Sequence, residues 1–327
     1  MHEKRVYVTR SIPGTGLDRL SVIANVNVHP GPGPPSHKTL LKNVRDCDGL
    51  LTMLSDKITP EVIDAAGPNM RIISNYAVGF NNIDVEYATQ KSIIIAHTPD
   101  VLTESTADLA WALLLTTARR VVEGDQLTRS EQWTGWEPTF MLGTDVHRKI
   151  IGIIGLGRIG LAVAKRALAF NMKVLYFSRT RKLNIESRLG IEYKPLGDLL
   201  AESDFVSIHV PLTSETEKML GTDQLNLMKS NAILINTARG GIVDERALVQ
   251  ALKSQIKGAG LDVYQEEPTR NRELFKLPNV VLTPHLGSAT LETRVKMADL
   301  AVDNLIYGLN KKYDKIKVAN PSVLSSF

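Results

Sequence analysis

The chain has 327 residues, a length that suits two domains better than a single core. Hydrophobic residues make up 43% of it and charged residues 23%, which argues against a disordered chain. The formal net charge of +4 is small and spread along the sequence, so nucleic-acid binding is not indicated. Cys47 is the sole cysteine, which excludes an intrachain disulfide framework.

The start of the chain carries no sign of a secretion signal, because a strand-like run begins by Arg5 with no long apolar segment before it. The most apolar helical stretch, Leu109–Ala118, is too short to cross a bilayer and is typical of a buried helix. We therefore expect a cytoplasmic protein that does not bind membranes.

Short apolar runs alternate with helical patterns in the first part of the chain. The predicted strands are Arg5–Thr9, Asn25–Val28, Gly49–Met53, Arg71–Asn75 and Ile93–His97. The glycine- and proline-rich stretch Gly31–Pro35 marks a surface loop. This alternation predicts a small parallel sheet with helices on both faces.

A long helical pattern begins near Thr103, and the loop Gln132–Pro138 separates it from a second series of strands. These strands are predicted over Lys149–Ile154, Lys173–Phe177, Phe205–Val210, Ala232–Thr237, Gly258–Val263 and Val280–Thr283. Helical segments such as Glu245–Lys253 fall between them. Six parallel strands complete a doubly wound nucleotide-binding sheet. A last helix, Ala289–Leu309, is expected to return the chain to the first domain.

A glycine-rich turn joins the strand at Lys149–Ile154 to a helix predicted over Leu161–Phe170. The turn reads Gly155-Leu156-Gly157-Arg158-Ile159-Gly160. Gly155 allows the tight turn, Gly157 lets the backbone approach a pyrophosphate, and Gly160 lets the helix pack on the sheet. The N–H groups at the helix N-terminus favour a phosphate. Strand, turn, helix and second strand together predict a dinucleotide site, which a lone glycine motif would not.

The second strand of this unit ends where an NAD site usually has a carboxylate, but the residues here are Ser178, Arg179, Thr180 and Arg181. Hydroxyl and guanidinium groups suit the 2′-phosphate of NADP, whereas a carboxylate would repel it. We therefore predict NADP(H) as the preferred cofactor and keep NAD(H) open. The alternative interpretation is a solvated basic turn.

Three polar groups follow later strands, at the sheet edge where open α/β sheets bind ligands. Arg239 can grip a carboxylate and polarise the neighbouring carbonyl group. His285 can give a proton to that carbonyl oxygen, and Glu267 can fix the tautomer of the imidazole. Taken singly, these residues also fit a turn, a solvated loop and a structural histidine. Taken together, they predict hydride transfer to a 2-keto acid.

Over nearly its whole length the chain resembles the D-isomer-specific 2-hydroxyacid dehydrogenase family, and within it the NADP-dependent glyoxylate/hydroxypyruvate reductases. The motifs that carry the resemblance are the glycine turn, Ser178–Arg181, Thr237–Gly240, Gly260–Val263, Glu266–Pro268 and Pro284–Ser288. The resemblance implies two doubly wound parallel-sheet domains. A Rossmann dinucleotide-binding domain (101–286) would be inserted into a smaller flavodoxin-like substrate domain (1–100 and 287–327).

The resemblance also implies further site residues and no metal site. For the cofactor these are Thr106, His209, Val210, Pro211, Thr237, Ala238, Asp262 and Gly287, along with the glycine turn, Ser178–Arg181, Arg239 and His285. Thr106 and Asp262 would lie at the nicotinamide end, whereas His209 could equally be structural. For the substrate they are Leu54, Val78 and Gly79, with Arg239 and His285. The N–H groups of Val78 and Gly79 would meet its carboxylate.

Several alternatives stay open at this point. A D-3-phosphoglycerate dehydrogenase would often carry an additional C-terminal region and prefer NAD. A formate dehydrogenase would have an amide in place of Glu267. The same fold also serves in a nucleotide-sensing corepressor, which would show little turnover. Family members are commonly homodimers, here through residues 103–147, and either Trp133 or Trp136 would then reach a neighbouring active site or simply pack in its own loop.

Overall fold

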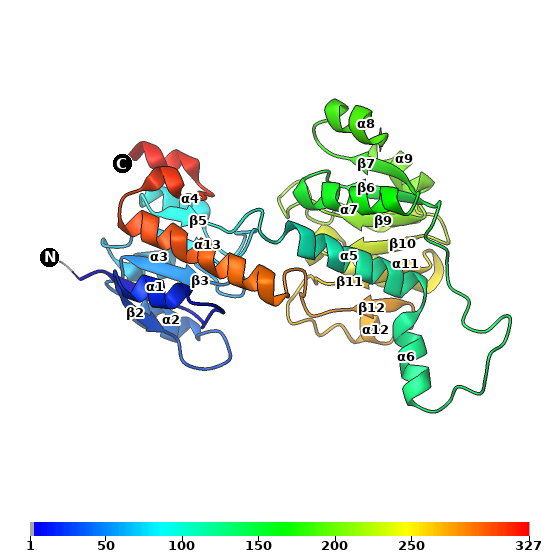
Figure 1. Cartoon of the computed structure of the whole chain (residues 1–327), viewed down its shortest axis with the longest axis horizontal. Helices are drawn as coiled ribbons and strands as arrows, with labels where there is room; N and C mark the ends of the chain where they lie inside the picture. The colour runs from blue at the N-terminus through cyan, green and yellow to red at the C-terminus, as the bar shows by residue number, and fades with distance from the viewer. Residues whose placement is uncertain (1–2, 327) are drawn as a thin grey trace. The chain divides into compact units, whose positions relative to one another are not determined.

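The computed structural model describes residues 3–326, which divide into two compact units (Figure 1). One unit takes in the chain up to Leu102 together with the stretch from Ala289 onward, and the other is Thr103–Ser288. Each of these boundaries lies two residues after the one expected from the sequence. Among residues 3–326, no helix is both long and apolar enough to pass through a membrane.

The first unit is built on a five-stranded parallel sheet. Its strands are β1 (Arg5–Val8), β2 (Asn25–Val28), β3 (Gly49–Thr52), β4 (Ile72–Asn75) and β5 (Ile94–Ala96). They lie in the order β2-β1-β3-β4-β5, and all four neighbouring pairs are parallel. This is the flavodoxin-like doubly wound order, so the predicted fold class of this unit is confirmed.

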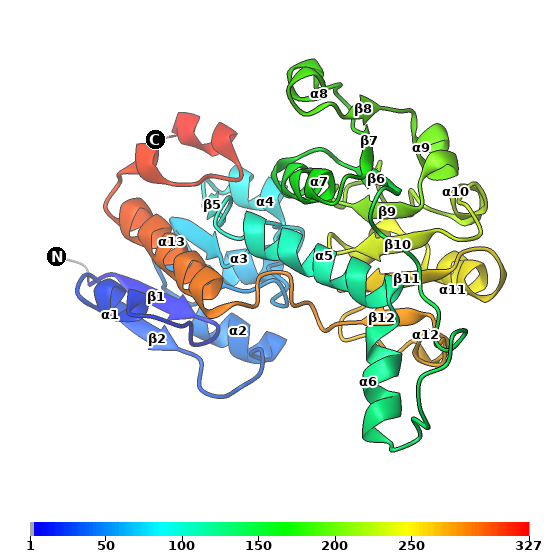
Figure 2. The same ribbon diagram turned by 45° about the vertical axis from the view of Figure 1, so that its right-hand side comes forward.

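Helices cover both faces of this sheet (Figure 2). They are α1 (Gly16–Ser21), α2 (His37–Asn43), α3 (Pro60–Ala66), α4 (Val85–Gln90) and α13 (Leu291–Leu309), with short 3₁₀ turns at Tyr313–Lys315 and Pro321–Ser326. Residues of α2, α3 and α4 share one core with Tyr7 and Ile73. On the other face, α13 lies against β3 and β4, and Ser74 Oγ donates to the carbonyl of Ala301 at 2.8 Å. The helix α13, near the end of the chain, therefore covers one face of a sheet that the N-terminal residues form.

The second unit contains a seven-stranded parallel sheet, one strand more than expected. Its strands are β6 (Ile150–Ile154), β7 (Lys173–Phe177), β8 (Glu192–Tyr193), β9 (Phe205–Ile208), β10 (Ile233–Asn236), β11 (Gly258–Leu261) and β12 (Val280–Leu282). Their order is β12-β11-β10-β9-β6-β7-β8, which is the Rossmann arrangement. The sequence did not predict β8, because two residues are too few to show an alternating pattern.

Two layers of helices enclose this sheet as well. They are α5 (Thr103–Ala118), α6 (Val121–Arg129), α7 (Arg158–Ala169), α8 (Leu183–Leu189), α9 (Leu196–Glu202), α10 (Thr222–Asn226), a 3₁₀ turn η1 (Gly240–Ile242), α11 (Glu245–Ser254) and α12 (Arg272–Phe275). On one face α5 and α7 pack on inward residues such as Ile153 and Ile235. On the other, α9, α10 and α11 pack on residues such as Leu234. The predicted doubly wound class is confirmed here too.

The helical pattern that begins at Thr103 breaks once. Arg120 has a φ of 54°, in the left-handed region, and the chain restarts as α6 in a new direction. None of the residues of α6 is buried, in contrast to α5. An extended stretch without helix or strand, including the predicted loop, then leads to β6.

Candidate active site

The glycine turn has the local geometry that a dinucleotide site requires. Gly155 has a φ of +98°, and a Cβ there would lie 2.7 Å from the carbonyl oxygen of His209. A Cβ on Gly160 would overlap the carbonyl of Gly155, so α7 packs as closely as predicted. In contrast, a Cβ on Gly157 would meet no protein atom within 4 Å. Leu156 is buried behind the turn, whereas Arg158 and Ile159 form the first, partly exposed turn of α7.

This difference predicts opposite effects for two alanine substitutions. Gly157 has a φ of −82°, which alanine adopts freely. For Gly157→Ala we therefore expect a change in unfolding free energy within about 0.5 kcal/mol. We expect a large loss of cofactor affinity, because the added Cβ would keep the backbone away from the pyrophosphate. Gly160→Ala forces the helix away from the turn and costs about 1–3 kcal/mol or more. Chemical denaturation and a fluorescence titration with NADPH measure the two effects. Normal NADPH binding by Gly157→Ala would contradict the phosphate assignment.

The residues predicted to meet the adenosine end lie just after β7, but they are not equivalent. Arg179 is exposed and makes no hydrogen bond or ion pair with any residue in 3–326. Arg181 instead forms a two-bond ion pair with Glu186, at 2.9 and 2.7 Å. Ser178 Oγ donates to the carbonyl of Thr180 at 2.7 Å and closes the turn. One guanidinium group is therefore unoccupied, and the other is engaged by the protein.

The end of β9 lies beside the glycine turn, and β10 is the next strand in the sheet. Val210 and Pro211 follow His209, whose carbonyl contacts Gly155. Thr237 Oγ1 is buried and has no hydrogen-bond partner among the described residues. Such a buried hydroxyl normally finds a partner, so the orphan group fits a bound cofactor, as does the open space at Gly157. The residues present are therefore compatible with a dinucleotide.

His209 follows β9 and lies beside Ser207. Its Nε2 lies 2.8 Å from Ser207 Oγ, and burial lowers the pKa of His209 to about 3. The unfolded chain binds a proton at His209 below about pH 6.5, whereas the folded protein resists this until about pH 3. His209 therefore contributes to a loss of stability as the pH falls through this window.

We expect His209→Gln to flatten this pH dependence. The glutamine can keep the bond to Ser207 without a titrating ring. The slope of unfolding free energy against pH between pH 6.5 and 3 should therefore fall by an amount on the order of 1 kcal/mol per pH unit. Urea unfolding of wild type and variant across this range measures the difference. The matched control is the same substitution at an exposed histidine, His147→Gln. Identical slopes for His209→Gln and wild type would refute the burial argument.

The three predicted catalytic residues lie on neighbouring loops of the same unit. Glu267 Oε2 and His285 Nδ1 are 2.7 Å apart, and Glu267 Oε1 accepts a bond from the Tyr264 backbone N–H at 3.1 Å. Burial tends to raise the pKa of Glu267, but the hydrogen bond and charge of His285 outweigh it, so this pKa is lowered. His285 has a φ of 56°, an uncommon conformation for a non-glycine residue that is typical of functional sites.

Arg239 lies one loop away and is connected to this pair by charge. Burial lowers the pKa of Arg239, and the negative charge of Glu267 opposes this shift only in part. Its Nη1 donates to the carbonyl of Ala238 at 2.6 Å. Asn236, whose role the sequence did not indicate, accepts a bond from the Ala238 N–H and donates to the Arg239 carbonyl, both at 3.0 Å. This buried amide fixes the backbone that carries the arginine.

Asp262 has a larger role than its predicted contact with the cofactor. Its carboxylate is buried and accepts three bonds, from Thr283 Oγ1 at 2.6 Å and from the N–H groups of Leu286 and Gly287 at 2.7 and 2.8 Å. It thereby holds both sides of His285. Gly287 in turn lies against Thr106 at the start of α5. Sequence spacing alone does not show which loop a strand-end carboxylate will hold.

The predicted substrate residues Leu54, Val78 and Gly79 lie in the first unit, on the loops that follow β3 and β4. The N–H groups of Val78 and Gly79 donate to no group in residues 3–326. Their carbonyls, in contrast, are held by His97 Nδ1 at 2.9 Å and by Asn75 Nδ2 at 2.8 Å. Two free N–H groups on a fixed backbone are suited to an anion.

Asn82 was also missed, and it connects these two loops. Its Nδ2 donates to the carbonyls of Met53 and Asp56 at 3.0 and 3.1 Å, and its Oδ1 accepts from Asn75 at 3.0 Å. The loop that carries Leu54 is thus fixed to the loop that carries Val78. Only the hydrogen-bond geometry reveals this link, because asparagine in a loop is ordinary.

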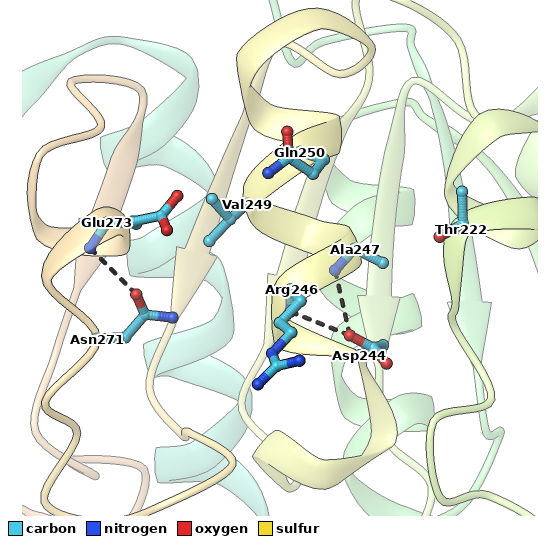
Figure 3. A pocket seen from close by; sticks show the side chains of 8 residues that line it. All are labelled: Thr222, Asp244, Arg246, Ala247, Val249, Gln250, Asn271 and Glu273. Carbon is cyan, nitrogen blue, oxygen red and sulfur yellow. Dashed lines mark hydrogen bonds between the residues drawn. The ribbon is translucent and has the colours of Figure 1, made fainter.

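The second unit also has a pocket of about 560 Å³ beside α11 (Figure 3). It is lined by Thr222, Asp244, Arg246, Ala247, Val249, Gln250, Asn271 and Glu273. None of the predicted site residues is among them, and Asp244 and Asn271 cap the helices α11 and α12 there. Within residues 3–326, no group of three side chains is arranged to hold a metal ion.

Comparison with known proteins identifies the family. Residues 111–287 match the model described as D-isomer specific 2-hydroxyacid dehydrogenase, NAD binding domain. The chain is 54% identical over 307 residues to the glyoxylate reductase of Thermococcus kodakarensis, a match that covers 92% of each protein. This chain belongs to the D-isomer specific 2-hydroxyacid dehydrogenase family.

Solved structures agree with membership of the family. The TT0316 protein from Thermus thermophilus is 48% identical with a TM-score of 0.88, covering 94% of this chain and 97% of that one. An NADPH-dependent glyoxylate/hydroxypyruvate reductase from Sinorhizobium meliloti, solved with NADP and malonate, is 35% identical with a TM-score of 0.83, covering 94% of each chain. The chain is therefore an oxidoreductase that acts on a small 2-keto acid with a nicotinamide cofactor.

Proposed function

We propose that the protein reduces glyoxylate, and also hydroxypyruvate, to the corresponding 2-hydroxy acid with NADPH, and that His285 is the general acid. The observation that carries this proposal is the 2.7 Å bond between Glu267 and His285, on a loop that Asp262 fixes on both sides. Membership of a family with glyoxylate reductases at 54% identity supports the substrate class.

Each residue of the proposed site has a separate task. Arg239 binds the substrate carboxylate and polarises the adjacent carbonyl. The N–H groups of Val78 and Gly79 in the first unit are suited to bind a carboxylate as well. His285 Nε2 gives its proton to the carbonyl oxygen, while Glu267 holds the Nδ1 side of the ring. When bound, the nicotinamide supplies the hydride. The keto group thus gains a hydride on carbon and a proton on oxygen, and the imidazole is left neutral.

The preference for NADP(H) over NAD(H) is supported by Arg179. Its guanidinium group is exposed and has no ion-pair partner in residues 3–326, so it is available to a 2′-phosphate. We expect Arg179→Asp to weaken NADPH binding by about 10–150-fold, because one charge-assisted contact of about 1.5–3 kcal/mol is lost. Steady-state kinetics with NADPH and NADH measure the change. Unchanged NADPH kinetics would rule out this assignment.

A substrate panel tests the reaction itself. Absorbance of NADPH and NADH is followed with glyoxylate, hydroxypyruvate, pyruvate and phosphohydroxypyruvate as substrates. We expect the highest kcat/KM with glyoxylate or hydroxypyruvate and NADPH. A preference for phosphohydroxypyruvate with NADH would indicate a phosphoglycerate dehydrogenase, and no turnover with any keto acid would favour the corepressor-like alternative.

We also propose a homodimer formed through the segment after α5. Apolar side chains there are unusually exposed: Val121 (53%), Trp133 (54%), Trp136 (82%) and Leu142 (63%). Trp133 Nε1 donates within its own loop, to the carbonyl of Gly135 at 2.7 Å, so Trp136 is the better candidate for contact with a second copy. Sedimentation of the wild type should give a dimer, and Trp136→Ser should weaken it.

A further inference from the structure

One of the two arginines after β7 is held by an acidic side chain of α8. Glu186 accepts bonds from Arg181 Nε and Nη2 at 2.9 and 2.7 Å. Tyr176 Oη donates to the same carboxylate at 2.6 Å. Arg181 also lies over the ring of Tyr193, 5.7 Å from its centroid. The edge of the guanidinium group that best matches a phosphate is therefore occupied.

We call Tyr176, Arg181 and Glu186 the acidic clamp. The side chain of Glu186 is only 13% exposed, against 57% for Arg181. Hydrogen bonds from Arg181 and Tyr176 lower the pKa of Glu186 to about 2, so the carboxylate is ionised at neutral pH. Tyr176 Oη also accepts the backbone N–H of Lys182 at 2.7 Å, which ties the clamp to the turn.

Arg179 has no comparable partner. It is exposed, and in residues 3–326 it makes neither a hydrogen bond nor an ion pair. The pKa of Glu215 is lowered, mainly by a hydrogen bond from Thr213. The positive charge of Arg179 makes the smallest contribution to this lowering. The two arginines that look alike in the sequence are thus in different states.

We propose that Glu186 determines cofactor selectivity by withholding Arg181, so that Arg179 alone meets the 2′-phosphate. This inference rests on the NADP preference proposed above. It assigns that preference to the guanidinium group of Arg179 alone. A single contact favours NADPH but still admits NADH, since nothing repels a ribose hydroxyl. Release of Arg181 would add a second cation and sharpen the preference.

A double-mutant cycle tests the clamp through dissociation constants for NADPH and NADH, measured by fluorescence titration. Arg181→Ala should change the Kd for NADPH by less than about 3-fold, whereas Arg179→Ala, the matched control, should raise it about 10–150-fold. Glu186→Gln should lower the Kd for NADPH by about 3–10-fold and leave that for NADH unchanged. In Glu186→Gln/Arg181→Ala this gain should disappear.

Three outcomes would overturn the inference. Arg181→Ala could weaken NADPH as much as Arg179→Ala does, which would make Arg181 a direct ligand. The gain of Glu186→Gln could persist without Arg181, which would make it a general charge effect. NADPH and NADH could change equally, which would make Glu186 a scaffold only. An unaffected NADPH affinity in Arg179→Ala would instead refute the proposed NADP preference. The Glu186–Arg181 cycle does not change Arg179, so its outcome is distinct from that result.

Discussion

An asparagine in place of His285 is expected to lower kcat for 2-keto acid reduction by about 10²–10⁴-fold, because the proton donor is removed. Asparagine keeps a polar group next to Glu267 and does not disturb the three bonds of Asp262 to the surrounding loop. The fold and the affinity for NADPH should therefore be retained. Single-turnover kinetics and a cofactor titration on the same sample separate the two properties.

Glu267→Gln is the companion variant. The amide can still accept the bond from Tyr264, but it no longer balances a charged imidazole. We expect a smaller loss of kcat than for His285→Asn and a shifted pH profile for reduction. Near-normal turnover by His285→Asn with intact cofactor binding would show that another group supplies the proton.

Gly240→Ala is expected to have the largest effect on the structure itself. A Cβ on Gly240 would overlap the backbone of Tyr264 and of Gln265, and backbone atoms cannot rotate away as side chains do. Gly240 follows Arg239, and Tyr264 binds Glu267, so the substitution separates two catalytic loops. We expect a loss of about 3 kcal/mol or more in unfolding free energy, together with loss of turnover.

Gly241→Ala provides the control next to it. Its Cβ would lie 3.3 and 3.4 Å from two methyl groups of Leu212, a side chain that can move. We expect a change of less than about 1 kcal/mol and activity close to wild type. Denaturation curves measure the unfolding free energies of Gly240→Ala and Gly241→Ala, and turnover of glyoxylate measures their activities. Equal stability of the two alanine variants would show that the loops can separate without cost.

The sequence was sufficient for the fold because most of its strands are apolar runs in parallel sheets, buried on both faces. The strands Asn25–Val28 and Lys173–Phe177 were predicted to the residue, and the other expected strands differ by one or two residues at their ends. β8 escaped because it pairs through only two residues, Glu192 and Tyr193. The break between α5 and α6 escaped because nothing in the apolar pattern requires Arg120 to be left-handed.

The site was harder to predict wherever a residue acts through its partner. From the sequence, Arg179 and Arg181 were both predicted to bind the cofactor. Only the hydrogen bonds between Arg181 and Glu186 distinguish the two arginines. Asn75 and Asn82 are seven positions apart and carry no motif, yet they hold two loops together. Strand-end position predicted Arg239 and His285, because that edge is a general property of α/β sheets.

The first unit is assembled from both ends of the chain, and this bears on the order of events during synthesis. β3 and β4 leave the ribosome long before Leu291–Leu309, the helix that covers one of their faces. The whole of the second unit is made in between, so it can fold first as a complete domain. The N-terminal sheet meanwhile keeps an apolar face uncovered. Newly made chains that lack the last helix should therefore be the species most prone to aggregate and most dependent on chaperones.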